Sequence, residues 1–201
     1  MDTQERKART LWMVQTAILT AIIILMAFTP LGYIKTAGLE ITFIMIPVAV
    51  GAILMGPKTG ALLGTVFGLT SFIQCFGLSA FGAILLQINP FYTFIVTMVP
   101  RILMGWLVGV IFQALHRIDR TKFISFAVAS LSGAVINTIL FIAGLFLLFG
   151  NTEFIRSWGP TWPTIFAIIA GVNALLEAGI SLVAGTAVTK ALYRVVNKQP
   201  V

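Results

Sequence analysis

Charged residues are scarce in this chain. Only 9% of its 201 residues are Asp, Glu, Lys or Arg, whereas 59% are hydrophobic, and the mean hydropathy is +1.03. A soluble domain of this length carries roughly 25% charged residues. The composition therefore excludes an ordinary soluble domain and predicts an integral membrane protein. Because the length is that of one compact domain, we expect residues 1–201 to form a single unit.

Residues that carry chemistry are also scarce. The single cysteine, Cys75, excludes an internal disulfide, and with one histidine, His116, the chain shows no metal-binding pattern. A Ser–His–Asp set, a zinc signature and a pair of catalytic carboxylates are all missing. The chain also lacks the G-x-x-x-x-G-K-[ST] loop that binds ATP, and "GPKTG" around Lys58 predicts a turn. We therefore expect no metal, no cofactor and no enzyme activity, and an enzyme that acts on lipid is disfavoured for the same reason.

Apolar segments dominate what is present. A bilayer core of about 30 Å needs about 20 apolar residues per helix. We expect an all-α bundle of six transmembrane helices at approximately residues 11–28, 41–55, 61–76, 91–115, 123–149 and 164–192. The first segment follows the basic stretch "RKAR", but its apolar run is too long for a signal peptide and no cleavage pattern follows it.

The distribution of basic residues predicts the orientation. With the N-terminus inside, the outer loops hold only two basic residues, Lys35 and Arg156, whereas the inner segments hold ten. The ten are Arg6, Lys7, Arg9, Lys58, Arg117, Arg120, Lys122, Lys190, Arg194 and Lys198. Cytoplasmic loops carry the excess of Lys and Arg, so we expect both termini to be cytoplasmic. The net charge of +7 therefore reflects membrane topology, and we expect no nucleic-acid partner.

The expected outer loops are longer than the inner ones and rich in aromatic and turn residues. Tyr33, Tyr92, Trp158 and Trp162 lie in or beside them. They form either an aromatic belt at the membrane interface or part of a lid that closes over a ligand from outside. The sequence leaves both interpretations open.

Polar side chains from three expected helices reach a similar depth. At 1.5 Å per residue, Arg101 lies about 15 Å below the outer end of its helix. Asn173 and Glu177 lie about 14 and 20 Å down the last helix, and Asn137 is near the middle of the fifth. An isolated charge at this depth costs at least ~2.5 kcal/mol, so we expect Arg101 to face the protein interior.

Two roles for Arg101 follow, and they can coexist. Arg101 can pair with Glu177 and thereby fasten two helices. Alternatively, it binds an anionic group of a ligand, because the guanidinium fork suits a carboxylate. In that case Glu177 holds Arg101 until the ligand competes, and the asparagines bind hydroxyl or amide groups.

Small residues recur at a spacing of four in two of the expected helices. Gly60, Gly64 and Gly68 in "GALLGTVFG" predict close packing within the bundle. Ala17 and Ala21 in "AILTA" form a similar pair on the first helix.

Three stretches carry a resemblance to a known family. They are the basic N-terminus before "TLWMVQTAILTAIIILMAFTPLG", the Ala17–Ala21 pair within it, and "IMIPVAVGAILMGPKTGALLGTVFG". On these residues the whole chain resembles the substrate-binding S components of energy-coupling-factor (ECF) vitamin transporters. The resemblance implies a high-affinity subunit in the prokaryotic cell membrane that binds its vitamin from outside. It also implies that the alanine pair contacts a transmembrane coupling subunit, whose two attached ATPases drive the S component to topple.

Within that family, the stretch "INPFYTFIVTMVPRILMGW" looks most like the pantothenate-specific branch. Pantothenate carries a carboxylate, hydroxyls and an amide, but no flat ring system. We expect Arg101 to bind the carboxylate. The other expected contacts are Asn89, Tyr92, Asn137, Asn173, Glu177 and Trp162. Riboflavin, folate, hydroxymethylpyrimidine, biotin and cobalamin remain alternative ligands, and a stand-alone carrier or channel for a small solute remains an alternative function.

Overall fold

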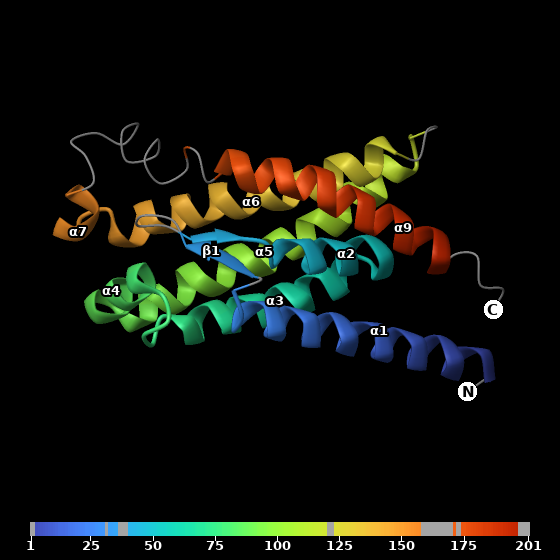
Figure 1. Cartoon of the computed structure of the whole chain (residues 1–201), viewed down its shortest axis with the longest axis horizontal. Helices are drawn as coiled ribbons and strands as arrows, with labels where there is room; N and C mark the ends of the chain where they lie inside the picture. Colours follow the sequence, from blue (N-terminus) through green and yellow to red (C-terminus); the bar gives the residue numbers. More distant parts are fainter. Residues whose placement is uncertain are drawn as a thin grey trace.

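The computed structural model describes residues 3–30, 32–35, 40–119, 123–157, 171 and 174–196. Within these ranges the regular structure is helical apart from one short two-stranded antiparallel ribbon (Figure 1). The strands are β1 (Tyr33–Lys35) and β2 (Glu40–Thr42). The helices are α1 (Thr3–Ala27), α2 (Met45–Met55), α3 (Pro57–Gln74), α4 (Ala80–Ile88), α5 (Pro90–His116), α6 (Ile124–Phe149), α7 (Glu153–Arg156), η1 (Ser181–Gly185, a π-helical turn) and α9 (Thr186–Val196).

Four helices of the described residues are long and apolar enough to cross a membrane. They are Gln4–Ala27, Pro90–His116, Ile124–Phe149 and Ala174–Val195. α2 is a shorter apolar helix, and α3 has 18 residues that include several glycines and hydroxyl side chains. The expectation of an all-α membrane protein is confirmed. Residues 164–170, 172 and 173 of the last expected span lie outside the described residues.

The starts of the second and third helices differ from those expected, for local reasons. The second helix begins at Met45 rather than at residue 41, because Glu40–Thr42 pairs with β1 instead. The third begins at Pro57, since proline is favoured in the first turn of a helix. Gly56, with a φ of 91°, supplies the sharp turn between these two helices, a conformation that favours glycine.

The expected outer loops contain regular structure that the sequence pattern does not predict. The ribbon occupies the first loop, α4 lies between α3 and α5, and α7 follows α6. α4 begins at a cap in which Ser79 Oγ accepts a hydrogen bond from Gly82 N–H at 3.2 Å, and Pro90 begins the next helix. In Figure 1, α4 and α7 lie at one end of the molecule, and the ribbon is displaced towards that end.

The opposite end carries the first turns of α1 and the last turns of α9. The end of α5 and the start of α6 lie at this end too (Figure 1). The described chain therefore begins and ends at the same end of the molecule. Arg120 and Lys122, which belong to the expected inner loop between α5 and α6, lie outside the described residues.

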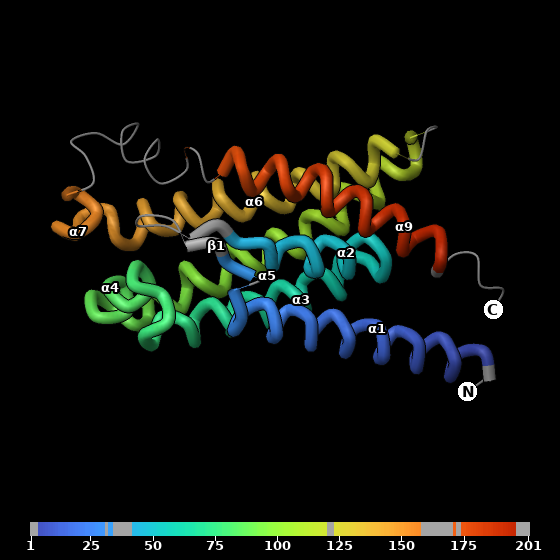
Figure 2. Tube along the Cα trace, in the orientation of Figure 1, coloured from blue at the N-terminus to red at the C-terminus, as the bar shows by residue number. Residues whose placement is uncertain are grey.

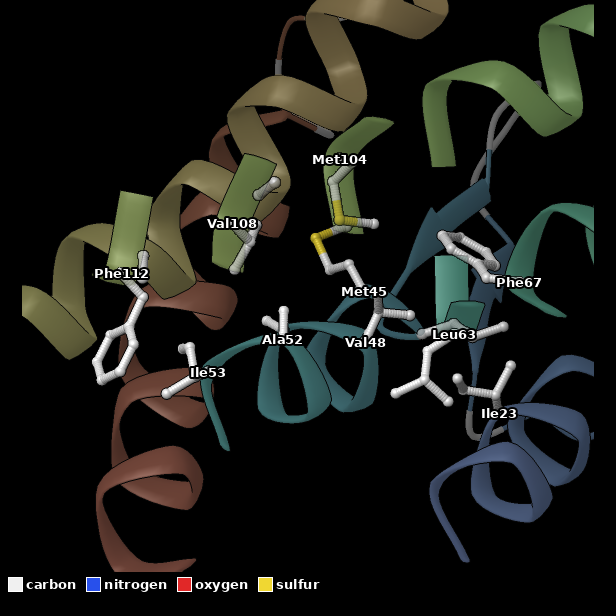
Figure 3. Close-up of a cluster of buried hydrophobic side chains, with 14 of the residues drawn as sticks. Ile23, Met45, Val48, Ala52, Ile53, Leu63, Phe67, Met104, Val108 and Phe112 are labelled. Carbon is white, nitrogen blue, oxygen red and sulfur yellow. The ribbon is translucent and has the colours of Figure 1, made fainter. Parts of the chain in front are cut away.

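α2 supplies much of the core of the bundle. Eight of its 11 residues are buried. Met45 and Val48 point towards Met104 of α5 and Leu63 of α3, and Ile23 of α1 borders the same cluster (Figure 3). Because lipid is as apolar as these side chains, the bundle is stabilised by close packing rather than by removal of apolar surface from water.

α3 and α5 meet along a line of glycines. A Cβ atom at Gly60 would collide with the carbonyl oxygen of Gly105, and one at Gly64 would collide with that of Arg101. Gly68 continues the same line. The prediction that these glycines pack within the bundle is confirmed. Their contact also fixes the backbone of α5 at the point where it carries Arg101.

α1 lies at the edge of the bundle, alongside α2 and α3 (Figure 2). One face of α1 is anchored: Trp12 Nε1 donates to Thr59 Oγ1 at 2.9 Å, and Ile23 is fully buried. Ala17 and Ala21 are exposed on the other face. Exposed apolar neighbours extend this face: Val14, Ile18 and Leu25.

Candidate functional site

A cavity of about 140 Å³ lies between the helices, bounded by the ribbon and α4. This volume is about ten times the space that one buried water needs, so the cavity is large enough for a small ligand. Its walls come from β1, β2, α3, α4, α5, α6 and residues 174–177. The polar residues of its lining are Tyr33, Thr42, Ser71, Gln74, Ser79, Thr97, Arg101, Asn137, Thr138 and Glu177.

The position of the Arg101 side chain depends on the residue that precedes it. Pro100, in the interior of α5, has no N–H and cannot donate to the Val96 carbonyl four residues earlier. Arg101 Nη1 donates to this carbonyl instead, at 2.9 Å. In an apolar environment a released backbone carbonyl needs another donor. The Pro–Arg pair therefore both frees a backbone acceptor and satisfies it, which orients the guanidinium along α5.

Two aromatic rings flank this guanidinium. Arg101 Cζ lies 5.5 Å from the ring centroid of Phe67 and 4.8 Å from that of Phe141. Such cation–π contacts stabilise a cation at a site with little water. Among the described residues, the buried Arg101 Nε has no hydrogen-bond partner. Because the rings lie against the guanidinium, a further partner reaches its edge, where a carboxylate can accept two parallel hydrogen bonds.

Two more buried polar atoms of the cavity wall have no hydrogen-bond partner within the described part of the chain. They are Ser71 Oγ and Asn137 Oδ1. Leaving such an atom without a partner costs about 1–3 kcal/mol, and unpaired buried groups are exceptional in native proteins. A guanidinium edge, a hydroxyl and an amide oxygen thus surround one cavity. This set suits a small ligand that combines a carboxylate with hydroxyl or amide groups.

Glu177 lines the same cavity, but its carboxylate is engaged elsewhere. Its Oε1 accepts a hydrogen bond from the backbone N–H of Thr42 at 2.8 Å. Within the described ranges, no ion pair shorter than 4.0 Å joins Glu177 to Arg101. The two groups interact electrostatically without a direct ion pair, and the role of Glu177 as resting partner of Arg101 stays a prediction. The hydrogen bond of Glu177 connects the last helix to β2, because the ribbon folds against the bundle at this point.

The structure brings three of the predicted contacts together. Arg101, Asn137 and Glu177 come from three helices and line one cavity, as their similar depth indicates. Asn173 and Trp162 lie outside the described residues, as does Trp158 of the proposed lid.

Two predicted contacts are not among the lining residues of the cavity. Asn89 caps the N-terminus of α5, and its Oδ1 accepts hydrogen bonds from the N–H groups of Phe91 and Tyr92 at 3.0 and 3.1 Å. Tyr92 is partly exposed and packs edge-on against Phe149, with ring centroids 6.0 Å apart. Both residues therefore organise the N-terminal end of α5. Tyr33, the other described aromatic residue of the proposed lid, does line the cavity.

Several lining residues were not predicted from the sequence. Ser71 and Gln74 lie near the C-terminal end of α3, and Gln74 Nε2 donates to the Ala27 carbonyl at the end of α1. Thr97 lies on α5, one turn before Arg101. The signal for the first two was present, because Ser71 and Gln74 are polar residues three apart within an apolar segment and so share a helical face.

Comparison with known proteins identifies the family of the chain. The family model described as "ECF transporter, substrate-specific component" matches residues 12–188. The chain is 30% identical over 166 residues to the pantothenic acid transporter PanT of Lactococcus lactis subsp. cremoris, an alignment that covers 78% of this chain and 79% of that protein. It is 31% identical over 195 residues to the pantothenate transporter PanT of Leuconostoc mesenteroides subsp. mesenteroides, covering 87% of this chain and 93% of that protein.

Proposed function

Because the chain belongs to the family of ECF transporter substrate-specific components, we propose that it binds pantothenate in the cell membrane as the substrate-binding subunit of an ATP-driven importer. Two relatives that match most of the chain are pantothenate transporters. The chain is a multi-pass membrane protein with four described helices of spanning length. We infer a role in transport rather than catalysis.

One observation supports a ligand with a carboxylate most directly. The guanidinium of Arg101 is held by the Val96 carbonyl and by two aromatic rings, while its Nε has no partner among the described residues. An arginine cannot lose its proton to reduce the cost of burial. A carboxylate at this edge supplies both a counter-charge and the missing hydrogen bonds.

The remaining groups of pantothenate fit the other polar atoms of the cavity. In this proposal Asn137 Oδ1 accepts a hydrogen bond from a hydroxyl or from the amide N–H, and Ser71 Oγ binds a second polar group. Apolar carbons of the ligand contact Phe141 and Leu85, which also line the cavity. Glu177 does not contact the carboxylate in this arrangement; its hydrogen bond to Thr42 keeps β2 against the last helix.

The proposed topology has six spans and cytoplasmic termini. α2 and α3 are then two short spans joined by the turn at Gly56, and the α4 end faces outward. The basic residues at the opposite end favour this orientation by the positive-inside rule. Ala17 and Ala21 are then available to the transmembrane coupling subunit, to which the two ATPases are attached, and this chain binds no ATP or other cofactor itself.

Ligand binding and transport can be separated in one experiment. The purified chain is placed in proteoliposomes, and binding of pantothenate and of competing vitamins is measured by titration. Uptake is then measured with and without the coupling subunit and its ATPases. We expect tight pantothenate binding by the chain alone and uptake only with the complete module. Preferential binding of another vitamin would overturn the assignment of pantothenate as the ligand. Full-rate uptake without the module would indicate a stand-alone carrier.

A further inference from the structure

A second hollow lies on the surface at the end of the molecule where α9 ends. It has a volume of about 510 Å³ and lies between Phe123 and Ala127, at the start of α6, and one face of the last helix. The residues on that face are Leu182, Val183, Thr186, Ala187, Lys190, Ala191 and Arg194. None of them lines the cavity around Arg101, so this groove is a separate site.

The groove is apolar along most of its length and cationic at one end. Ala127, Ala187 and Ala191 have small side chains and leave room between α6 and α9. Lys190 and Arg194 are one turn apart on α9, on the side of the groove nearest the C-terminus. An apolar trough that ends in two cations matches the chemistry of an anionic amphiphile.

Lys190 is oriented by an aromatic ring. Its Nζ lies 4.4 Å from the ring centroid of Phe123, a cation–π contact between α9 and the start of α6. Neither Lys190 nor Arg194 forms an ion pair within 4.0 Å with another residue that the structure describes. The positive charge of both side chains is therefore available to an anion that enters the groove.

The length of the groove fits a lipid in one leaflet. From Leu182 to Arg194 a helix rises roughly 18 Å, and the hydrocarbon of one leaflet is about 15 Å deep. Basic pockets between helices at the membrane boundary bind phosphate head groups. We propose that the groove binds an anionic phospholipid, with its phosphate at Lys190 and Arg194 and an acyl chain along the alanines. The assignment to the inner leaflet follows from the proposed topology.

The test uses the full chain in nanodiscs that contain phosphatidylglycerol and phosphatidylcholine. Bound lipid is counted by native mass spectrometry for the wild type and for the variants Lys190→Gln and Arg194→Gln. We expect retained phosphatidylglycerol to fall roughly fivefold for each substitution, with phosphatidylcholine unchanged. Ala187→Phe, which fills the trough without altering charge, should also displace phosphatidylglycerol.

Matched variants separate this site from general effects. Arg9→Gln removes a charge from the exposed start of α1, outside the groove, and Val188→Phe adds a ring to α9 on a neighbouring face. Both should retain phosphatidylglycerol. Thermal unfolding in phosphatidylcholine alone, without vitamin, should be the same for all variants, which tests the fold independently of pantothenate binding. Inorganic phosphate should not stabilise the wild type against thermal unfolding, because the acyl chain is part of the ligand.

Two outcomes would overturn the proposal. Equal loss of phosphatidylglycerol from Arg9→Gln and Lys190→Gln would indicate general attraction to an anionic surface. Unchanged lipid binding by Lys190→Gln and Arg194→Gln, together with weaker association with the coupling subunit, would assign the groove to a protein partner.

Discussion

Two helices of this protein carry small residues at a spacing of four and use them in opposite ways. On α3, Gly60 and Gly64 lie against the backbone of α5 with no room for a Cβ atom. On α1, Ala17 and Ala21 are exposed, away from the anchored face of the helix. The same pattern therefore allows close packing of α3 against α5, whereas on α1 it lies on an exposed face. The spacing predicts a close approach, but it does not identify the partner.

The buried line of glycines also connects packing to function. Gly64 lies directly against the carbonyl of Arg101 and thereby sets the distance of α5 from α3. Phe67, which flanks the guanidinium, is less than one turn further along the same helix. The glycine line therefore supports the wall of the proposed ligand site. Under the proposed function, the exposed face with Ala17 and Ala21 contacts the coupling subunit of the transporter.

The largest effect is expected from Gly64→Leu. The new side chain collides with the backbone of Arg101, and backbone cannot move aside as a flexible side chain can. We expect a loss of about 3 kcal/mol or more in the free energy of unfolding, together with loss of ligand binding. Thermal unfolding in detergent and pantothenate titration measure the two effects. A folded Gly64→Leu variant with normal affinity for pantothenate would show that the glycine line does not determine ligand binding.

Arg101→Lys tests the site itself. Lysine keeps the charge but lacks the planar fork, so affinity for pantothenate should fall by roughly 1–3 kcal/mol. An amide analogue without the carboxylate charge should bind the wild type poorly and lose little more in the variant. Titration of both ligands with both proteins gives a double comparison. Equal losses for the acid and the amide would show that Arg101 acts on the fold and not on the carboxylate.

Pro100→Ala is expected to have a smaller and more specific effect. Alanine restores a backbone N–H that can donate to the Val96 carbonyl. This N–H replaces the hydrogen bond that Arg101 Nη1 donates to the same carbonyl. We expect affinity to fall by about 0.5–1.5 kcal/mol, while the melting temperature stays the same or rises, because alanine is a better helix former. Pro90→Ala, at the first turn of the same helix, is the matched control and should change neither quantity. Unchanged affinity in Pro100→Ala would show that the Val96 contact does not position Arg101.

The sequence predicts the helices and the depth of the polar residues better than it predicts their partners. Arg101, Asn137 and Glu177 line one cavity because helical rise and the cost of buried charge restrict where they can lie. The depth of a residue along its helix does not determine how the helix is rotated about its axis or where the side chain points. Glu177 therefore binds the N–H of Thr42, and Arg101 binds a carbonyl of its own helix.

The segments that the sequence places in the outer loops are predicted least well. α4 and the ribbon are short. α4 is as apolar as the spans, and each strand has only three residues, Tyr33–Lys35 and Glu40–Thr42, so periodicity does not identify either element. Asn89 illustrates the consequence: it was expected to bind ligand, but an Asn before a Pro at the start of a helix is also the pattern of an N-cap. Local backbone chemistry explains this residue fully.

The smallest effect on the isolated protein is expected from Ala21→Leu, on the exposed alanine face. The added atoms point away from the bundle, where no described residue of the chain packs on them, so melting temperature and pantothenate affinity should match the wild type. ATP-driven uptake with the complete module should nevertheless fall steeply, because a larger side chain prevents the close helix approach that small residues permit. Val14→Leu lies on the same exposed face but enlarges a side chain that is already branched, and it should reduce uptake less. Binding and uptake are therefore measured on the same preparations, with the chain alone and with the module. If Ala21→Leu lowers affinity in the isolated chain, the alanine face contributes to the bundle as the glycine line does. If both affinity and uptake are normal, the coupling subunit docks on a different face of the molecule.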